Sequence, residues 1–358
     1  MKKKRKVLFF LPSNTGGAER MTITLAKMLP LDEFEVKFVI VHRSLGTIVK
    51  FIPQEYEIIH IPVHNIWCAA TLRMINVIRR EKPDVVFSSL LHLNYRLIVA
   101  AKICGVKAIV RNNINFNEYV SNYIRTMVFL TYRWAYKVIA QQEEMHDEII
   151  EFTGISAQRV ITLHNPIDTG SIDEKIKAPS PFIHSDNQLK YVWVARFSRE
   201  KGHDLLIKAL HLVRKKNSNA HLYLVGKYDP SEVFYQELIS LVDSLDLKDY
   251  VHFVGFDSNP YRWVKNGDVY VMPSRLEGLP NSLIDAMYLG KPVVATRCIP
   301  VIDRIVEDGY NGYVVPSEDV EAMAEAMLKA PELKNFNMTY RPASKEDVVD
   351  LFRNKYTK

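Results

Sequence analysis

Short apolar runs alternate with amphipathic segments along the first half of the chain. Seven runs rich in Val and Ile predict β-strands, over residues 7–11, 35–41, 57–61, 84–88, 108–110, 137–140 and 160–163. Between them, apolar residues recur at i, i+3 and i+4, which predicts helices over 17–29, 70–81, 94–104 and 119–136. Near-continuous apolar strands separated by helices are typical of a parallel sheet covered on both faces.

The second half of the chain repeats this pattern after a break. Six further strands are predicted, over 191–195, 221–225, 251–254, 269–272, 292–295 and 313–315. Helices are predicted over 203–215, 233–245, 281–289 and 318–329, with a final amphipathic helix over 345–356. The sequence therefore predicts an α/β protein made of two Rossmann-like units.

The break between the two series predicts a domain boundary. Asn165-Pro166-Ile167-Asp168 is followed by a polar, Pro-bearing stretch up to Gln188 with little periodicity, as in an inter-domain linker. We expect a first domain over 1–168 and a second over 169–344, both of ordinary domain size. The C-terminal helix, within 345–358, is expected to pack back on the first domain.

The composition is that of a globular protein. Of the 358 residues, 47% are hydrophobic and 25% charged, and no run approaches the ~20 apolar residues of a membrane span. The basic start at 2–6 precedes an apolar run shorter than a signal-peptide core, so we expect a solvated lead-in to the first strand. Cys68, Cys104 and Cys298 lie far apart without metal or redox spacing, which favours a reducing, cytoplasmic compartment.

Positive charge is concentrated in the first half. Residues 1–168 hold 22 Lys and Arg against 15 Asp and Glu, a net charge of +7, whereas residues 169–358 hold 25 against 26, a net charge of −1. The excess favours an anionic partner: a phosphate-bearing substrate, an anionic membrane or nucleic acid, with ordinary solvated charge as the alternative. No aromatic stacking motif or known module accompanies the charge, so nucleic-acid binding is not expected.

Residues 274–287 contain the strongest candidate site. They follow a predicted strand and open a helix, with Gly278 permitting a tight backbone and Pro280 suited to the first helical turn. Glu277 and Asp285 could bind hydroxyls of a sugar and a ribose, unless they are ordinary loop and helix-surface charges. The start of the helix would offer an anion the free amides of Asn281, Ser282 and Leu283.

Two other strand ends carry candidate binding residues. After the first strand of the second half, Arg196 and Lys201 stand where a diphosphate would lie at the carboxyl edge of the sheet, although such a loop can also be a solvated turn. After the first strand of the chain, Gly16 and Gly17 would let a ligand approach the backbone and the next helix N-terminus. The chain has no G-x-G-x-x-G sequence, which argues against a dinucleotide dehydrogenase.

Taken together, these segments resemble the retaining GT-B glycosyltransferases of family 4. The motifs that carry the resemblance cover nearly the whole chain: Gly16-Gly17-Ala18-Glu19, Asn165-Pro166-Ile167-Asp168, Arg196 and Lys201 separated by four residues, Val225-Gly226, Val254-Gly255, Glu277 and Asp285 separated by seven, and 290–296 through 311–315. The resemblance implies the GT-B fold, in which two Rossmann-like domains face each other across a cleft. It also implies transfer of a sugar, with retention of anomeric configuration, from a nucleotide diphosphate sugar to an acceptor.

The resemblance implies a donor site in the second domain. Arg196 and Lys201 would hold the diphosphate, Glu277 a hydroxyl of the donor sugar and Asp285 the ribose. The other donor-binding residues that it implies are Gly16, Gly17, Gly255, Gly278, Leu279, Pro280, Asn281 and Ser282. First-domain loops would bind the acceptor, a glycan or lipid-linked glycan, in surface polysaccharide or glycoconjugate synthesis. The donor is expected to be UDP-linked, and no cofactor or metal is expected, because fixed charges and amides would replace the absent Asp-x-Asp metal motif.

Two positions depart from the family pattern. The second carboxylate is usually Glu, and Asp285 is one methylene shorter. Many relatives carry His after the strand predicted over 108–110, where this chain has Arg111-Asn112-Asn113-Ile114-Asn115. No catalytic His is therefore assigned, and His92 and His164 are interpreted as ordinary polar or core residues.

Two other activities fit the same architecture. One is a GT-B sugar-nucleotide epimerase, and the other is a non-catalytic two-domain sugar-binding protein, which would normally need export. Segment 119–137 also suggests a partner, because its aromatic residues are mixed with Arg125, Arg133 and Lys137. With the basic start, this predicts peripheral association of the first domain with the inner face of an anionic membrane, and a core helix with snorkelling ends is the alternative.

Overall fold

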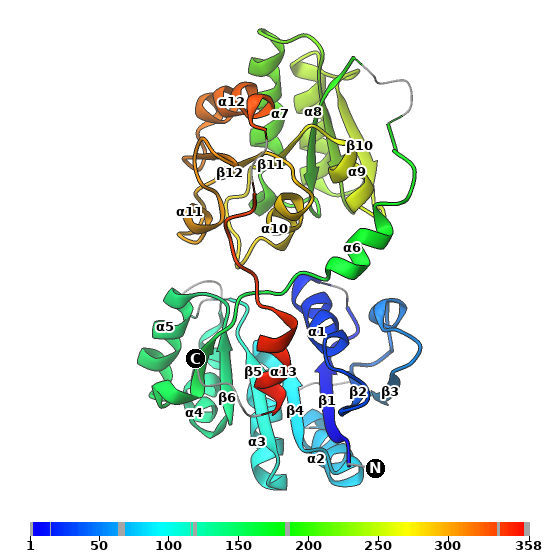
Figure 1. Ribbon diagram of the computed structural model, residues 1–358, viewed down its shortest axis with the longest axis vertical. Helices are drawn as coiled ribbons and strands as arrows, with labels where there is room; N and C mark the ends of the chain where they lie inside the picture. Colours follow the sequence, from blue (N-terminus) through cyan, green and yellow to red (C-terminus); the bar gives the residue numbers. More distant parts are fainter. Residues whose placement is uncertain are drawn as a thin grey trace. The chain divides into compact units, whose positions relative to one another are not determined.

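The computed structural model describes residues 3–14, 16–63, 69–114, 116, 120–182, 187–334 and 337–353. The chain forms two compact units (Figure 1). Unit 1 comprises Met1–Ile167 and Pro342–Lys358, and unit 2 comprises Asp168–Arg341. Over these described residues, to which the strands and helices given below also refer, each unit is built on one parallel β-sheet.

The sheet of unit 1 has seven strands in the order β3-β2-β1-β4-β5-β6-β7. The strands are β1 (Arg5–Leu11), β2 (Phe34–Val41), β3 (Glu57–Ile61), β4 (Val85–Ser88), β5 (Lys107–Arg111), β6 (Lys137–Ala140) and β7 (Val160–Thr162). The α-helices are α1 (Gly17–Lys27), α2 (Ala69–Glu81), α3 (Leu91–Cys104), α4 (Asn122–Thr131), α5 (Glu143–Thr153) and α13 (Lys345–Arg353). The strand order reverses between β1 and β4, and ligands of such sheets bind at the carboxyl ends of the strands near a reversal.

Apolar layers cover both faces of this sheet. One layer contains residues of α2, α3, α4 and α5, and the other contains residues of α1 and α13. The ring of Phe352 in α13 lies 5.5 Å from that of Phe9 and 5.8 Å from that of Phe87, measured between centroids. Arg353 donates to Oε1 of Glu33 at 2.6 Å. The C-terminal helix, red in Figure 1, is therefore part of the core of unit 1.

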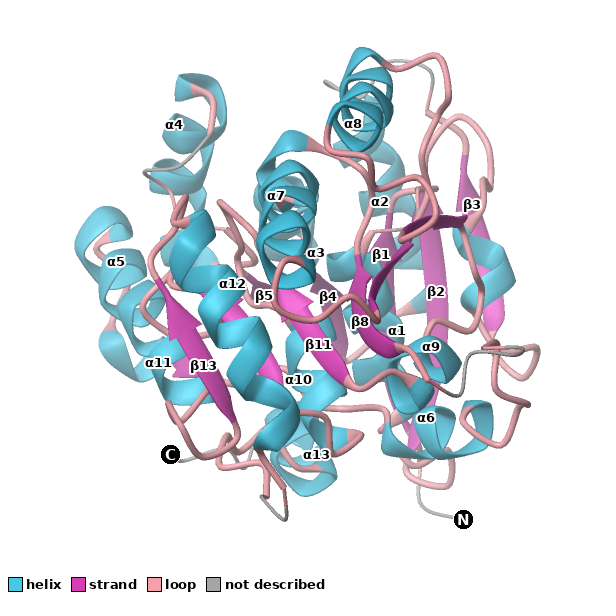
Figure 2. Ribbon diagram, turned by 90° about the horizontal axis from the view of Figure 1, so that it is seen from above, coloured by secondary structure: helices cyan, strands magenta, loops and turns pink. Residues whose placement is uncertain are grey.

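The sheet of unit 2 has six strands in the order β10-β9-β8-β11-β12-β13. The strands are β8 (Leu189–Val194), β9 (Ala220–Val225), β10 (Val251–Gly255), β11 (Val269–Met272), β12 (Val293–Thr296) and β13 (Gly312–Val315). The α-helices are α6 (Thr169–Lys175), α7 (His203–Arg214), α8 (Val233–Ser244), α9 (Tyr261–Asn266), α10 (Asn281–Tyr288), α11 (Ile302–Ile305) and α12 (Val320–Lys329). Helices lie on both faces of the sheet (Figure 2), and the strand order reverses between β8 and β11.

The α/β architecture of two Rossmann-like units is confirmed, and each strand of the described chain overlaps a predicted strand. The helices α5, α6, α9 and α11 were not predicted. Helix α6 occupies the stretch expected to be a linker, and it begins where the Asp168 carboxylate accepts a hydrogen bond from the Ser171 amide at 3.2 Å. A helix of two turns is too short for apolar periodicity to reveal.

The segment predicted as one helix over 119–136 is shorter and has a break. Helix α4 ends at Thr131, and a 3₁₀ turn, Tyr132–Trp134, follows it. Tyr119 lies outside the described residues. Over the part of the chain that the structure describes, no helix is both long and apolar enough to cross a bilayer. Cys104 and Cys298 are free thiols, and Cys68 lies outside the described residues.

Candidate functional site

Two loops leave the carboxyl edge of the unit 2 sheet from neighbouring strands. The β8–α7 loop (195–202) carries Arg196 and Lys201, and the β11–α10 loop (273–280) carries Glu277. Because β8 and β11 are paired at the point where the strand order reverses, both loops lie where ligands of open α/β sheets bind.

Backbone contacts hold the two loops together. The amide of Arg275 donates to the carbonyl oxygen of Glu200 at 2.8 Å. Gly202 has a φ of +65°, and a Cβ atom there would lie 1.9 Å from the carbonyl oxygen of Pro273. Glycine at 202 is therefore required both by the left-handed backbone and by the close approach of the second loop.

Lys201 and Glu277 form an ion pair. Nζ of Lys201 lies 2.8 Å from Oε1 of Glu277, and the two side chains are only 18% and 11% exposed. The hydroxyl of Ser274 donates to the same oxygen at 2.8 Å. A mostly buried pair needs such additional hydrogen bonds to offset the loss of hydration. The fold thus brings together two of the predicted site residues that lie far apart in the sequence.

Arg196 has a different environment from Lys201. Its side chain is 72% exposed, and its Nη2 atom donates to Oε1 of Glu200 at 2.7 Å. Exposed pairs of this kind contribute little to stability, so exchanging Glu200 for an anionic ligand would cost little. Arg196 is thus a surface cation that can reorient, whereas Lys201 is held in place by Glu277.

The start of α10 corrects one expectation. The amide of Asn281 donates to the carbonyl of Leu279 at 3.0 Å, and that of Leu283 to the carbonyl of Pro280 at 3.1 Å, so neither amide is free. Pro280 is the N-cap residue rather than part of the first turn. Of the three amides expected to form an anion cradle, the one at Ser282 keeps no backbone acceptor within the described chain. The compact turn that begins at Gly278 uses the other two itself.

Asp285 lies on the second turn of α10 and is half-buried. Burial raises the pKa of the Tyr270 hydroxyl well above its usual range, and the nearby carboxylates of Glu277 and Asp285 add to this rise. Burial also raises the pKa of the Cys298 thiol to about 11, and Glu277 contributes there too. The charges of the two predicted carboxylates therefore both act on one buried tyrosine of β11.

Gly255 ends β10 at a change of register against β9. Its φ is +83°, which favours glycine, and a Cβ atom there would lie 3.8 Å from Cε1 of Tyr228. Its carbonyl oxygen accepts from the amide of Gly226 at 2.9 Å. Gly255 is thus placed at the carboxyl edge of the sheet, on a strand that β9 and β8 separate from β11.

In unit 1, the Gly16-Gly17 pair begins α1, with Gly16 as its N-cap residue. A Cβ atom on Gly16 would lie 2.6 Å from Oε2 of Glu19, whereas nothing lies within 4 Å of one on Gly17. Glu19 is 8% exposed, and burial raises the pKa of its carboxyl, partly offset by hydrogen bonds from its own amide and that of Gly16. The missing side chain of Gly16 therefore makes room for Glu19, which occupies the helix N-terminus expected to be open to a ligand.

The end of β5 carries Arg111 and Asn112, which are 3% and 0% exposed. Arg111 donates through Nη2 to the side-chain oxygen of Asn165, and Tyr132 donates to Oδ1 of Asn112 at 2.8 Å. Burial lowers the pKa of Arg111 to about 9. These residues form a buried polar network after β5, where no catalytic His was assigned.

The two histidines interpreted as ordinary residues are both half-buried in unit 1. Burial lowers the pKa of His92, and the nearby guanidinium of Arg96 lowers it further. His164 lies just after β7. Within the described ranges, no group of three or more His, Cys, Asp or Glu side chains has the arrangement of a metal site.

Several residues of the site were not predicted. Ser274 and Arg275 lie inside the motif, and Gly202 follows Lys201 directly, but a single sequence does not show which motif residues make contacts. Thr296 of β12 was missed as well, and its hydroxyl donates to the carbonyl of Ser274. A single hydroxyl on a neighbouring strand does not change the pattern of apolar residues in the sequence, so its contact with the site is visible only in the folded structure.

Two family models match consecutive parts of the chain. The model described as "Glycosyl transferases group 1" matches residues 174–347, and the model described as "Glycosyltransferase Family 4" matches residues 15–171. The first match contains both loops of the candidate site, and the second contains the Gly16-Gly17 pair. The first match covers most of unit 2, and the second covers most of the N-terminal part of unit 1.

Individual proteins support the same assignment. A Campylobacter jejuni N-acetylgalactosamine-N,N'-diacetylbacillosaminyl-diphospho-undecaprenol 4-alpha-N-acetylgalactosaminyltransferase is 23% identical over 94% of this chain and 93% of its own. The Erwinia amylovora amylovoran biosynthesis glycosyltransferase AmsK is 22% identical over 90% of this chain and 76% of its own. The crystal structure of Anabaena HepE in complex with UDP has a TM-score of 0.77 at 20% identity, over 98% of this chain and 95% of that one.

Proposed function

Because this chain belongs to the glycosyl transferases group 1 family of GT-B glycosyltransferases, we propose that it transfers a hexosyl group from a UDP-linked sugar to a glycan or lipid-linked glycan, with retention of anomeric configuration. The product would enter a surface polysaccharide or glycoconjugate. This proposal is supported by the relatives of matching length, whose names include amylovoran biosynthesis and a diphospho-undecaprenol acceptor, and by the UDP complex of the structural neighbour.

The observation that carries the proposal is the pairing of Lys201 with Glu277 beside Arg196. A diphosphate leaving group develops negative charge as the bond to the sugar breaks, and fixed cations stabilise that charge without reorganisation. Glu277 would accept a hydrogen bond from a hydroxyl of the donor sugar and fix its orientation. Asp285 would contact the ribose.

The proposed reaction needs no group beyond donor, acceptor and these residues. The bond between the anomeric carbon and the diphosphate oxygen breaks, and the acceptor hydroxyl oxygen bonds to the same carbon on the same face. The proton of that hydroxyl passes to the departing phosphate oxygen. Lys201 and Arg196 stabilise the phosphate until it has taken this proton. Retention follows because attack and departure share one face.

Transfer is expected to be independent of metal ions, because Arg196, Lys201 and the Ser282 amide would supply the positive charge. The test begins with thermal-shift screening against a panel of nucleotide sugars, since a bound donor raises the unfolding temperature. Product formation is then followed with the selected donor and a glycan acceptor, with and without EDTA, and the anomeric configuration is read by NMR. Loss of activity in EDTA with recovery in Mn²⁺ or Mg²⁺ would show that transfer requires a metal ion. Donor turnover without any acceptor would indicate an epimerase.

We also propose that unit 1 binds peripherally to an anionic membrane, on its cytoplasmic face, through a surface around α4. Exposed apolar side chains and cations alternate here: Tyr123, Phe129, Leu130 and Trp134 are 43–47% exposed, and Arg125 and Arg133 lie beside them. Tyr132 is not part of this surface, because it is fully buried. Such a mixture suits the boundary between headgroups and acyl chains.

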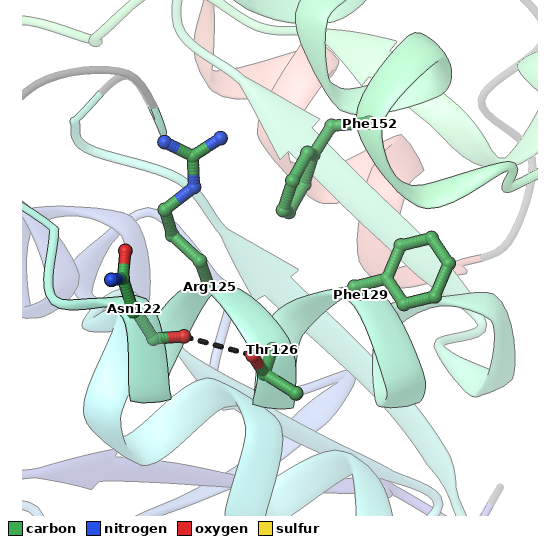
Figure 3. A pocket seen from close by; sticks show the side chains of 5 residues that line it. All are labelled: Asn122, Arg125, Thr126, Phe129 and Phe152. Atoms are coloured by element: carbon green, nitrogen blue, oxygen red, sulfur yellow. Dashed lines mark hydrogen bonds between the residues drawn. The ribbon is translucent and has the colours of Figure 1, made fainter.

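A pocket of about 500 Å³ opens in this surface beside α4. Figure 3 shows Arg125 and Phe129 on either side of Phe152 of α5; the Arg125 guanidinium lies 5.3 Å and the Phe129 ring 6.1 Å from the Phe152 ring. A phosphorylated headgroup would bind the guanidinium of Arg125, and an acyl chain would pack on the rings of Phe129 and Phe152. The partner that this chemistry favours is therefore a lipid surface.

Flotation with liposomes tests the membrane proposal. We expect binding to vesicles with anionic lipid at low salt, weakened at high salt, and lost when Phe129 and Trp134 are both replaced by Ser. Replacement of Val233, an apolar residue of unit 2 that is 72% exposed, by Ser is the matched control and should bind like the wild type. Absence of binding to anionic vesicles at low salt would refute the proposal.

A further inference from the structure

Arg275 lies two residues before Glu277 in the β11–α10 loop. Its guanidinium connects this loop to three other segments of unit 2: α7, the β8–α7 loop and the β13–α12 loop. Nη1 and Nη2 each lie 2.8 Å from one carboxylate oxygen of Asp204, in the first turn of α7. Nη1 also donates to the carbonyl of Arg199 at 2.7 Å. Two parallel hydrogen bonds to one carboxylate give both strength and a fixed orientation.

The fourth segment is the loop between β13 and α12. There the carboxylate of Glu318 accepts from Nε and, at 3.2 Å, from Nη2 of Arg275. Glu318 has a φ of +66°, a left-handed conformation that is strained for residues other than glycine. The guanidinium holds this strained residue at the border of the same group of loops.

The Arg275 cluster is ionised and only partly accessible to water. The hydrogen bonds that Arg275 donates to Asp204, followed by those to Glu318, raise the pKa of Arg275. Burial alone would raise the pKa of Asp204, but the hydrogen bonds and charge of Arg275 lower it overall. A lysine could not replace this residue, because a single ammonium cannot match two carboxylates and a carbonyl with one planar group.

We propose that Arg275 is a positioning residue that sets the distance and orientation of Glu277 relative to Lys201. Its amide binds Glu200 on the β8–α7 loop, and its side chain ties the β11–α10 loop to Asp204 and Glu318. The loop is thereby fixed on both sides immediately before Glu277. This inference rests on the proposed donor site, because it gives Arg275 no contact with substrate.

A double-mutant cycle with Glu277 tests this role. Arg275→Met should lower kcat by about 100-fold, the loss that a misplacement of about 1 Å can cause. Arg275→Lys should restore only part of the loss. When Glu277 is already Gln, Arg275→Met should cost less than about 3-fold, because residues that act through one another are not additive. Equal losses in both backgrounds would show that Arg275 is merely structural and would overturn the proposal.

Two further variants keep the outcome readable. Asp204→Asn removes the main partner of Arg275, and it should reproduce part of the kcat loss even if Arg275→Met does not fold. Arg353→Met is the matched control: the Arg353 side chain is 27% exposed against 28% for Arg275 and also contacts several carboxylates, but it lies in unit 1 near the start of β1. Its kcat should equal that of the wild type. If Glu277→Gln alone keeps full activity, the proposed role of Glu277 is wrong. If the effects of Arg275→Met and Glu277→Gln are additive, only the proposed role of Arg275 is wrong.

Discussion

The carboxyl edges of the two sheets have the same topology but different chemistry. In unit 2 this edge holds ion pairs, among them Lys201 with Glu277 and Arg275 with Asp204. In unit 1 the corresponding edge is lined mostly by neutral side chains that are buried and hydrogen-bonded to one another: Ser88, Asn94, Asn112, Gln141 and Asn165. Two charged residues are also buried near this edge: Glu19, in the first turn of α1, and Arg111, whose side-chain partner is the amide of Asn165.

This difference suits the two substrates proposed for the enzyme. A diphosphate needs cations that are already in place, and carboxylates nearby keep those cations oriented while the site is empty. An acceptor hydroxyl carries no charge, so amides and hydroxyls of unit 1 would be enough to bind it. Repeating one fold twice therefore gives one edge with paired charges and one edge lined mostly by neutral side chains.

The largest effect is expected at the carboxylates of unit 2. Glu277→Gln keeps the shape but removes the charge opposite Lys201, and it should lower kcat by about 10²–10³-fold. Asp285→Asn should leave kcat nearly unchanged and raise the donor KM about five-fold, the value of one hydrogen bond of about 1 kcal/mol. Asp285→Glu should be tolerated. Steady-state kinetics on the purified variants separates these outcomes.

Glu237→Gln is the control for these carboxylate variants, because Glu237 is an exposed carboxylate that binds Arg199 at the surface of unit 2. It should behave like the wild type. If Glu277→Gln turns over normally while Asp285→Asn is inactive, the two carboxylates have the opposite roles, and the assignment of the charged edge must be reversed.

The second effect concerns the cations of the same edge. Lys201→Ala and Arg196→Ala should each cost about 2–4 kcal/mol in kcat/KM, with Lys201 at the upper end because its loss also leaves Glu277 without its cation. Arg199→Ala, which removes an exposed cation of the same loop, is the control. Near-normal kcat/KM in both site variants would show that the β8–α7 loop is only a turn.

The sequence predicted the sheets better than it predicted the site. Strands were recognisable because runs such as Val269–Met272 are apolar on both faces, which the short helix Thr169–Lys175 is not. Lys201 and Glu277 were identified as candidates from their motifs, but their contact depends on the pairing of β8 with β11. The amides of Asn281 and Leu283 were predicted wrongly, because both donate to carbonyls of the compact turn before α10, whose path the motif does not reveal.

The third effect should appear in stability rather than catalysis, and in unit 1. Asn94 accepts from Ser88 and donates to the carbonyl of Arg111 at 3.0 Å and to the hydroxyl of Tyr132 at 3.1 Å. Asn94→Ala removes these three hydrogen bonds from a buried network and should reduce the free energy of unfolding by about 1–3 kcal/mol. Hydrogen exchange of the β4 and β5 amides measures this loss. Donor binding to unit 2 should not change, and Asn122→Ala, at an exposed position of unit 1, should change neither.

The smallest effect concerns pH and should be confined to unit 2. His203 begins α7 directly behind the β8–α7 loop, is fully buried and stacks on Phe197 with ring centroids 4.3 Å apart. Burial lowers its pKa from 6.5 to about 3, so the folded protein keeps this imidazole neutral where the unfolded chain protonates it. Stability is therefore unaffected above pH 6.5 and falls as the pH drops from 6.5 towards 3. Between pH 7 and 5.5 the loss from one such histidine is about 1 kcal/mol.

His203→Gln should remove this part of the pH dependence of stability. The measurement is the change in the unfolding free energy of unit 2 between pH 7 and 5.5. His211→Gln, on the same helix, should keep the wild-type dependence. An equal slope in both variants would mean that His203 is protonated in the folded protein. The core behind the β8–α7 loop would then contain a protonated histidine. The difference in charge between unit 2 and unit 1 would therefore extend from the loops into the core. If the pH dependence of the unfolding free energy is smaller in His203→Gln alone, His203 is neutral in the folded protein. The difference in charge between the two units is then confined to the loops that carry Lys201 and Glu277.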